Sequence, residues 1–222
     1  MKHQAAIFDI DGTLLDSVDF HAEAWRQAFL HFGRDFPFAD IRSQIGKGGD
    51  QLLPVFLSER EVALVGKVIE KTRGEIFKRE FLPRVKPFPG VRPLFERMKR
   101  DGLKIALASS SKREEVAHYA KLLEIEDLIE TGTSTDDAKK SKPEPDIFEA
   151  AMDKLGSPAA RRCVVIGDTP YDAEAAEKAG IKTVGVLCGG FPEEELRKAG
   201  AVAVFRDPAD LLRRYDESPL AE

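Results

Sequence analysis

The feature that most constrains the fold of this chain is a repeated alternation of short apolar runs with segments of helical spacing. Runs rich in β-branched and aliphatic residues occupy residues 5–10, 103–109, 128–133, 162–168, 182–187 and 201–205. Apolar residues recur at helical intervals in the segments between the later runs, and several of these segments end in Gly. Runs without polar alternation are typical of strands buried on both faces. The pattern therefore predicts an α/β fold, with a doubly wound, Rossmann-like parallel sheet covered by helices.

Residues 16–85 interrupt this alternation. Val18, Ala22, Trp25 and Phe29 lie at intervals that place them on one face of a helix. Further along, Ser58 is followed three residues later by Glu61, which predicts a capping box at the start of a second long helical stretch. No strand-like run occurs in this part of the sequence. We expect a helical domain of residues 16–85, inserted into a core made of residues 1–15 and 86–222.

Charge and composition exclude several classes of protein. The 222 residues include 34 basic and 39 acidic side chains, a formal net charge of −5, which argues against a general nucleic-acid binder. The two cysteines supply no disulfide framework, so a reducing compartment is the simpler interpretation. No apolar segment approaches the ~20 residues needed to span a bilayer, and the N-terminus has no signal-peptide pattern. We expect a cytoplasmic protein, a monomer or weak dimer, with no membrane or nucleic-acid partner.

Acidic side chains follow the predicted strands, at the edge of the sheet where sites of such folds lie. Asp9 and Asp11 lie at the end of the first run, and Asp168 ends the fourth, with Asp172 four residues later. If the first strand reached Asp9, the period of two would place Asp9 and Asp11 on the same side, where their charges repel. A turn at Asp-Gly would need only one of these acids. A bound hard cation such as Mg²⁺ would explain both.

A hydroxyl and a lysine complete the polar residues at this edge. Ser109 ends the second run, and Lys142 precedes Pro143 in "KKSKPEPD". Both side chains could bind an anion, for which phosphate is the natural candidate. An aspartate beside a metal and a lysine can attack phosphorus and form an aspartyl-phosphate.

Four motifs in this order carry a family resemblance: "DIDGT", the serine after the second run, "SKPEPDIF" and "IGDTPYDAEAAEKAG". They resemble the motifs of the haloacid dehalogenase superfamily over nearly the whole chain. The helical segment is similar to that superfamily's C1 cap, in the branch of phosphoglycolate phosphatase and beta-phosphoglucomutase. The resemblance implies a Mg²⁺-dependent phosphatase that hydrolyses a small phosphorylated metabolite, of the sugar phosphate or phosphoglycolate type, through an aspartyl-phosphate.

The resemblance also implies roles for individual residues. Asp9 is the expected nucleophile, and Asp11 the general acid and base, with its backbone carbonyl on Mg²⁺. Ser109 is expected to hydrogen-bond the transferring phosphoryl group, while Lys142 neutralises the charge that gathers on it. The expected metal-site residues are Asp9, Asp11, Asp168 and Asp172, the last orienting Lys142 or a metal-bound water. A helix-start role facing the helix dipole is the alternative for Asp172.

Four further residues are candidates for substrate binding: His21, Lys47, Gly48 and Ser110. His21 matches a histidine of the beta-phosphoglucomutases, although packing is the alternative for a histidine on an amphipathic helix. Lys47 and Gly48 belong to "IGKGGD" (45–50), which resembles the family's specificity loop, and a flexible turn is the alternative. The neighbouring Ser111 is expected to cap the next helix.

Two other functions remain open from the sequence. A beta-phosphoglucomutase-like phosphomutase is supported by His21, but such mutases carry an arginine in the cap loop where this chain has only Lys47. A phospho-accepting receiver domain also combines acids, a hydroxyl and a lysine around Mg²⁺. Receivers are much shorter and lack a cap, so the phosphatase is our main hypothesis.

Overall fold

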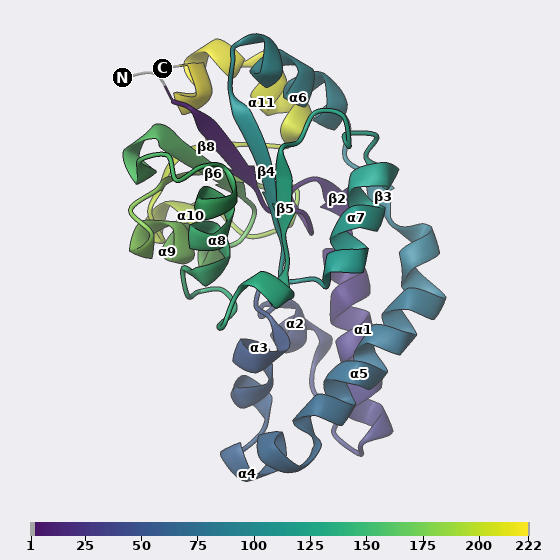
Figure 1. Ribbon diagram of the computed structural model, residues 1–222. Helices are drawn as coiled ribbons and strands as arrows, with labels where there is room; N and C mark the ends of the chain where they lie inside the picture. The colour runs from purple at the N-terminus through teal and green to yellow at the C-terminus, as the bar shows by residue number, and fades with distance from the viewer. Residues whose placement is uncertain (1–2, 222) are drawn as a thin grey trace.

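The structure, a computed structural model, describes residues 3–221. Its main feature is a six-stranded parallel sheet with the order β5–β4–β1–β6–β7–β8 (Figure 1). The strands are β1 (Ala5–Phe8), β4 (Lys104–Ala108), β5 (Thr131–Thr133), β6 (Cys163–Gly167), β7 (Lys182–Val186) and β8 (Ala201–Phe205). This is the doubly wound order, in which the chain reverses direction across the sheet beside the first strand. The predicted fold class is confirmed.

Helices cover both faces of the sheet: α6 (Val91–Arg100), α7 (Arg113–Leu122), α8 (Asp146–Lys154), α9 (Pro170–Lys178), α10 (Glu193–Lys198) and α11 (Pro208–Arg213). Successive β1 residues alternate between two apolar clusters. Phe8 packs in the cluster that holds Phe95 of α6, and Ile7 in the cluster that holds Phe148 of α8. Strand side chains are thus buried on both sides, which explains the apolar runs without polar alternation.

Two predicted strands are shorter than expected. The first ends at Phe8 because the chain then turns, with the backbone N–H groups of Leu14 and Leu15 both donating to the carbonyl of Ile10. Of the run 128–133, only Thr131–Thr133 pairs with β4, since Leu128 still belongs to a turn closed on Ile125.

The segment between the first strand and the rest of the core is helical. It contains α1 (Val18–His31), α2 (Phe38–Arg42), α3 (Gly49–Phe56), α4 (Glu59–Glu61) and α5 (Lys67–Ile76), with π-helical turns at Val62–Gly66 and Phe77–Phe81. Trp25 and Phe29 of α1 are buried, as their spacing predicts. The capping box of Ser58 and Glu61 is confirmed at the start of α4.

Two short antiparallel strands, β2 (Leu15–Asp16) and β3 (Lys86–Pro87), join this segment to the core. Asp16 therefore lies in a strand, and the first helix of the segment begins at Val18. The helical segment lies beyond the carboxyl ends of the strands, at the bottom of Figure 1. We propose that residues 16–85 form a separate cap domain over this edge of the core.

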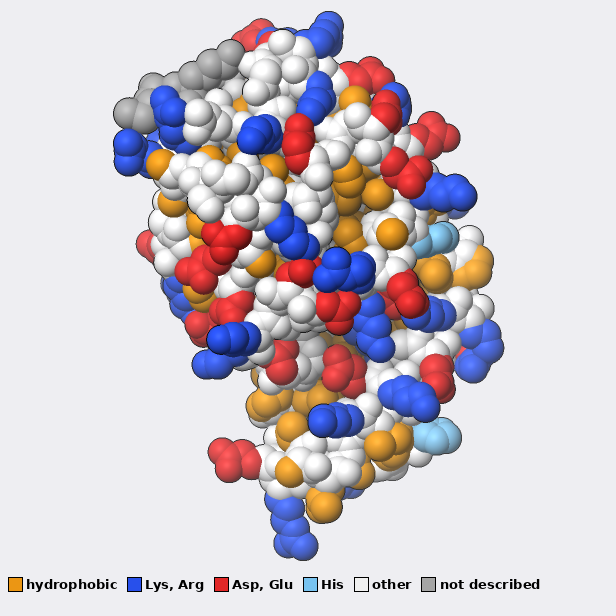
Figure 2. All heavy atoms as spheres, in the orientation of Figure 1, with side chains coloured by type: hydrophobic (Ala, Val, Ile, Leu, Met, Phe, Trp, Pro, Cys, Tyr) orange, Lys and Arg blue, Asp and Glu red, His pale blue; other side chains and the backbone are white. Residues whose placement is uncertain are grey.

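The surface seen in Figure 2 carries basic and acidic side chains intermingled over both the core and the helical segment. Within residues 3–221, no helix has the length and apolar character that crossing a membrane requires.

Candidate active site

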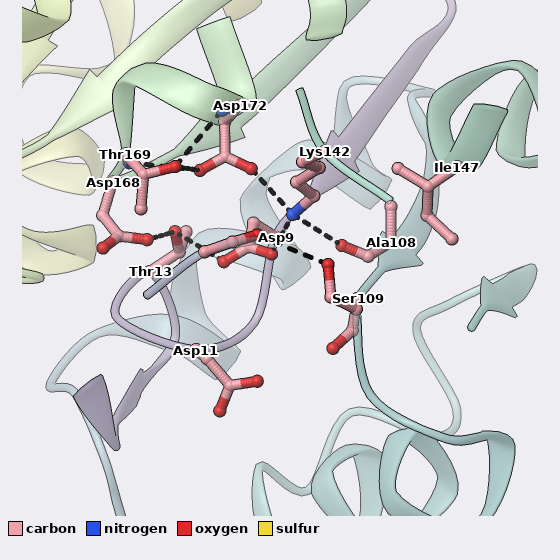
Figure 3. Close-up of polar contacts among 12 residues, drawn as sticks. Asp9, Asp11, Thr13, Ala108, Ser109, Lys142, Ile147, Asp168, Thr169 and Asp172 are labelled. Atoms are coloured by element: carbon pink, nitrogen blue, oxygen red, sulfur yellow. Dashed lines mark hydrogen bonds and ion pairs between the residues drawn. The ribbon is translucent and has the colours of Figure 1, made fainter. Parts of the chain in front are cut away.

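The centre of the site is an ion-pair cluster around Lys142. Asp9 is the first residue after β1, Asp172 lies in the first turn of α9, and Lys142 reaches both from the loop before α8 (Figure 3). The ammonium group of Lys142 contacts Asp9 Oδ1, and lies 2.7 Å from Asp172 Oδ1 and 3.5 Å from the carbonyl oxygen of Ala108. Asp9, Lys142 and Asp172 are all buried. The fold thus brings together three residues that the motifs place far apart in the sequence.

Asp168, the first residue after β6, lies beside this cluster. Its Oδ1 accepts a hydrogen bond of 2.9 Å from Thr13 Oγ1, and the same hydroxyl lies 3.4 Å from Asp9 Oδ2. A Cβ on Gly12 or Gly189 would lie 2.2 or 1.7 Å from Asp168 Oδ2, so both glycines are needed for the backbone to approach this carboxylate. That oxygen is buried and has no hydrogen-bond partner among the described residues.

Asp172 combines the two roles that the sequence left as alternatives. Its Oδ2 accepts hydrogen bonds from the backbone N–H and the hydroxyl of Thr169, at 3.1 and 2.7 Å, and so completes the capping box of α9. Its Oδ1 faces Lys142. The helix start therefore fixes the carboxylate that orients the lysine.

These carboxylates fit a divalent cation. Asp9, Asp168 and Asp172 each offer an oxygen, and the three oxygens lie within 4.8 Å of one another. When ionised, three carboxylates and one ammonium leave two negative charges uncompensated, and buried charge without compensation is strongly unfavourable. The unpartnered Asp168 Oδ2 is an available ligand atom. Oxygen ligands of this kind suit Mg²⁺.

Electrostatics support the same conclusion. Burial raises the pKa of Asp9 to about 7, against the lowering effect of Lys142 and with a further rise from Asp172. Burial, together with Asp9 and Asp172, also raises the pKa of Asp168. Burial would lower the pKa of Lys142, but the two aspartates hold it above its ordinary value. The metal-free cluster therefore takes up protons that a bound cation would displace.

The side chain of Asp11 points away from this cluster (Figure 3). Asp11 Oδ1 lies 2.9 Å from His21 Nε2 and accepts a hydrogen bond of 2.6 Å from Ser17. Burial opposes ionisation, but His21 and Ser17 hold the pKa of Asp11 below its usual range. The expectation that Asp9 and Asp11 face the same side is wrong because the strand ends at Phe8. Asp11 is not among the clustered carboxylates, so its predicted metal role would have to come from its backbone carbonyl.

Ser109 and Ser111, which follow β4, make different contacts. Ser109 is buried at the strand end, and its Oγ accepts a 3.0 Å hydrogen bond from the backbone N–H of Ser111, which leaves its own proton available for an anion. The prediction that Ser111 caps α7 is wrong: Lys112 occupies that position without a side-chain bond. The hydroxyl oxygen of Ser111 instead lies 3.4 Å from Asp11 Oδ2, because the loop after β4 turns toward the helical segment.

A cavity of about 40 Å³ connects the site with the helical segment. Its lining includes the predicted site residues Asp9, Asp11, His21, Lys47 and Ser110, and also Trp25, Ile45, Gly46, Arg73 and Ser111. The ring of His21 stacks on Phe77 with centroids 3.9 Å apart, so this histidine is both packed and in the cavity wall. Lys47 donates to Gln44 Oε1 at 2.6 Å and lies 4.5 Å from the ring centroid of Tyr171.

Gly48 does not line this cavity. A Cβ there would lie 2.0 Å from Ser141 Oγ, so Gly48 instead allows close packing against the loop that carries Lys142. Thr13 and Arg73 were not predicted as site residues from the sequence, and Trp25 was placed only on the apolar face of a helix. Thr13 is the last residue of the "DGT" sequence beside Asp11, so it could have been considered as a site residue. Arg73 could not, because helical spacing does not tell which end of α5 faces the core.

The chain is similar to known proteins over nearly its whole length. The chain is 30% identical over 215 residues to a "Phosphorylated carbohydrates phosphatase" of Thermotoga maritima, which covers 96% of this chain and 99% of the relative. It is 27% identical over 215 residues to a "Phosphoglycolate phosphatase" of Aquifex aeolicus, covering 95% of each. A crystal structure of a hydrolase from Pseudomonas syringae superposes with a TM-score of 0.89 at 32% identity, covering 96% of this chain and 98% of that one.

The match to a family is equally broad. Residues 6–186, from the first strand to the end of β7, match the family described as haloacid dehalogenase-like hydrolase. This span contains Asp9 and Asp168, which follow β1 and β6, and Lys142, which lies in the loop before α8. The chain therefore belongs to the haloacid dehalogenase-like hydrolase family.

Proposed function

We propose that this protein is a Mg²⁺-dependent phosphatase that hydrolyses a small phosphomonoester through an aspartyl-phosphate. The observation that carries the proposal is the placement of Asp9, a buried carboxylate that is paired with Lys142 and clustered with Asp168. The printed names of the two relatives, one acting on phosphorylated carbohydrates and one on phosphoglycolate, support the substrate class.

The reaction proceeds in two displacements at phosphorus. In the first, an oxygen of Asp9 forms a bond to phosphorus, the bond to the leaving oxygen breaks, and Asp11 gives that oxygen a proton. In the second, a water oxygen attacks the same phosphorus, Asp11 takes the water's proton, and inorganic phosphate leaves as Asp9 is regenerated. Asp11 is ionised in the free protein, but an incoming phosphate dianion raises its pKa by like-charge repulsion and so favours the acid form.

The remaining residues stabilise charge. Lys142 offsets the negative charge that builds up on Asp9 and the phosphoryl oxygens, and Ser109 donates a hydrogen bond to the same group. Asp9, Asp168 and Asp172, with the backbone carbonyl of Asp11, would hold the cation. When bound, Mg²⁺ would supply Lewis-acid charge stabilisation for the phosphoryl oxygens.

The size of the cavity supports a small substrate and a moving helical segment. The inner cavity, of about 40 Å³, is too small to hold a whole phosphomonoester by itself. Movement of the helical segment would widen it for substrate entry, and return of the segment would exclude bulk water during the reaction.

The test is phosphate release from a panel of small phosphomonoesters, with Mg²⁺ and with chelator. The panel includes phosphoglycolate and hexose and pentose phosphates. Asp9→Asn removes the nucleophile, so we expect kcat to fall by at least ~10⁴-fold. Circular dichroism checks that the variant stays folded. Residual activity near the wild-type level would exclude Asp9 as the nucleophile.

The contact between His21 and Asp11, at 2.9 Å, favours a phosphomutase as the second candidate. A mutase would return the phosphoryl group to the substrate instead of to water. Isomerisation of beta-glucose 1-phosphate, with little phosphate release, would identify that activity. The loop 45–50 argues against it, because Lys47 is its only cation.

We also propose that the enzyme acts in the cytoplasm as a monomer or weak dimer, on a phosphorylated metabolite. Size-exclusion chromatography with light scattering would measure its oligomeric state directly.

A further inference from the structure

Arg73 is a cation that the mechanism does not use. It lies on α5, and its guanidinium carbon is 5.1 Å from the ring centroid of Trp25. Its Nε is buried without a hydrogen-bond partner, and among residues 3–221 no ion pair joins it to a carboxylate. Because Trp25 covers one face of the guanidinium, the N–H groups at the edge remain available as a planar set of donors.

Arg73 also stands where two cavities meet. A groove of about 370 Å³ runs between α5 and the start of α7, and it shares Arg73, Ser110 and Ser111 with the small cavity that contains Asp9 and Asp11. A phosphoryl group placed at Asp9 has its leaving group directed away from the sheet. The leaving group of a substrate larger than the inner cavity must therefore pass Arg73 to reach the groove.

Charge pairing and position together distinguish Arg73 from the other cations of this groove. Lys78 lies 3.5 Å from Glu115, so these two charges offset each other. Lys71 lies 3.8 Å from Glu75 in the same way. Lys67 and Lys112 also line the groove without an ion pair among residues 3–221, but neither lines the inner cavity. Arg73 is therefore the cation of the groove that also lines the inner cavity. A partly buried guanidinium with an unpaired donor is suited to bind a carboxylate or phosphate through two parallel hydrogen bonds.

We propose that Arg73 recognises a second anionic group on the leaving group of the substrate. The preferred substrates would then be phosphomonoesters that also carry a carboxylate or a second phosphate, in contrast to those with a neutral leaving group. This inference rests on the proposed phosphatase function and deepens it. It makes Arg73 a specificity-determining residue with no part in the bond-breaking steps.

The test compares kcat/KM on matched substrates. Phosphoglycolate is paired with 2-hydroxyethyl phosphate, which replaces the carboxylate by a neutral group. Fructose 1,6-bisphosphate is paired with fructose 1-phosphate for the second phosphate. Loss of a charge-assisted hydrogen bond in Arg73→Gln should lower kcat/KM for at least one anionic member by ~10-fold to 100-fold, and change its neutral partner by less than about twofold. Arg73→Lys should recover part of the loss.

The control is Arg79→Gln, which removes an exposed cation of the same helical segment that pairs with Glu80 and lines neither cavity. It should leave both members of each pair unchanged. Equal losses on charged and neutral substrates in Arg73→Gln would show a structural role and overturn the inference. A wild-type enzyme without preference between the paired substrates would also overturn it.

Binding separates this inference from the proposed function. Calorimetric titration of Asp9→Asn with the same four compounds measures affinity without turnover. Preferential binding of an anionic member, lost when Arg73→Gln is added, supports the inference even if the wild type releases no phosphate and the proposed function fails. Equal binding within each pair, or no binding by any compound, contradicts it.

Discussion

A single hydroxyl group links the two acids that flank the proposed metal position. Thr13 is fully buried, and its Oγ1 lies 2.9 Å from Asp168 Oδ1 and 3.4 Å from Asp9 Oδ2. One proton cannot serve both bonds, and the shorter distance assigns it to Asp168. The bond turns one oxygen of Asp168 toward the threonine and leaves Oδ2 for a cation. Thr13 thus orients a ligand without needing to touch the metal itself.

Replacement of Thr13 by Val should therefore weaken Mg²⁺ binding. The two side chains have nearly the same shape, so the main change is loss of the hydrogen bond to Asp168. Loss of such a supporting bond typically costs ~10-fold to 100-fold in metal affinity. The Mg²⁺ concentration for half-maximal phosphate release should rise by that factor, with kcat at saturating Mg²⁺ close to the wild type. An unchanged Mg²⁺ titration would show that Thr13 does not orient the ligand.

The pKa of Asp9 predicts how stability of the metal-free enzyme depends on pH. Its pKa is about 7 when folded and 3.8 in its ordinary state, so between these values the folded protein binds more protons than the unfolded one. The free energy of unfolding must then fall as pH rises from about 4 to 7, by on the order of a few kcal/mol. The lowered pKa of Asp11 acts at more acidic pH, and Lys142 titrates at far higher pH.

Urea denaturation in chelator, at pH 5 and pH 7.5, measures this effect against Asp9→Asn. The raised pKa of Asp168 acts in the same direction in both proteins, but the variant lacks Asp9, so its stability relative to the wild type should increase with pH. Addition of Mg²⁺ should abolish most of the trend, since the cation stabilises the ionised cluster. A difference that stays constant with pH would contradict the raised pKa of Asp9.

At this scale, the sequence predicted which residues gather at the strand ends, but not the direction of side chains that lie in turns. Asp9 and Asp168 follow parallel neighbours β1 and β6, so their meeting follows from the sheet alone. Asp11 and Ser111 lie in loops whose direction depends on local hydrogen bonds, and both turn toward the helical segment. Arg73 lies on α5, and the spacing of apolar residues in the sequence does not predict how this helix packs against the core.

At the scale of elements, burial explains what could be read from the sequence. Strands covered on both faces are apolar nearly throughout, which made β1, β4, β6 and β7 recognisable. The edge strand β8 was recognisable from its aliphatic residues, although Val202 is exposed. The edge strand β5 includes two half-buried residues and only three in all, so its pattern gave poor boundaries. The strands β2 and β3 pair through two residues each, which is too short for any periodic signal. The bounds of β5 and the presence of β2 and β3 depend on pairing with distant strands, which the local sequence does not encode.

At the scale of the whole molecule, several polar contacts hold the helical segment against the core. Arg42 of α2 donates to the carbonyl of Gly189 at 3.0 Å, beside Asp168. The hydroxyl of Tyr171, on α9, donates to the carbonyl of Ser43 at 2.6 Å. The backbone N–H of Ser141 donates to Asp50 at 3.1 Å. These contacts join loops next to the site to the segment whose movement we propose for substrate entry.

Tyr171→Phe should loosen this closed arrangement selectively. The variant loses the hydrogen bond to Ser43 but keeps a ring for Lys47 to lie over. One such bond contributes ~0.5–1.5 kcal/mol, which corresponds to a change of roughly 2-fold to 13-fold in the equilibrium between closed and open arrangements. Amide hydrogen exchange measured by mass spectrometry should therefore accelerate by that factor in peptides covering residues 43–50.

The strand β4 supplies the internal reference for this measurement. Its buried side chains belong to the two main apolar clusters and not to the one that Tyr171 packs against, so exchange in residues 104–108 should match the wild type if only the helical segment has opened. Faster exchange in both regions would indicate that the whole fold is destabilised instead. Unchanged exchange in residues 43–50 would mean that Arg42 and Ser141 suffice to hold the segment closed, and that the tyrosine hydroxyl makes no net contribution to closure.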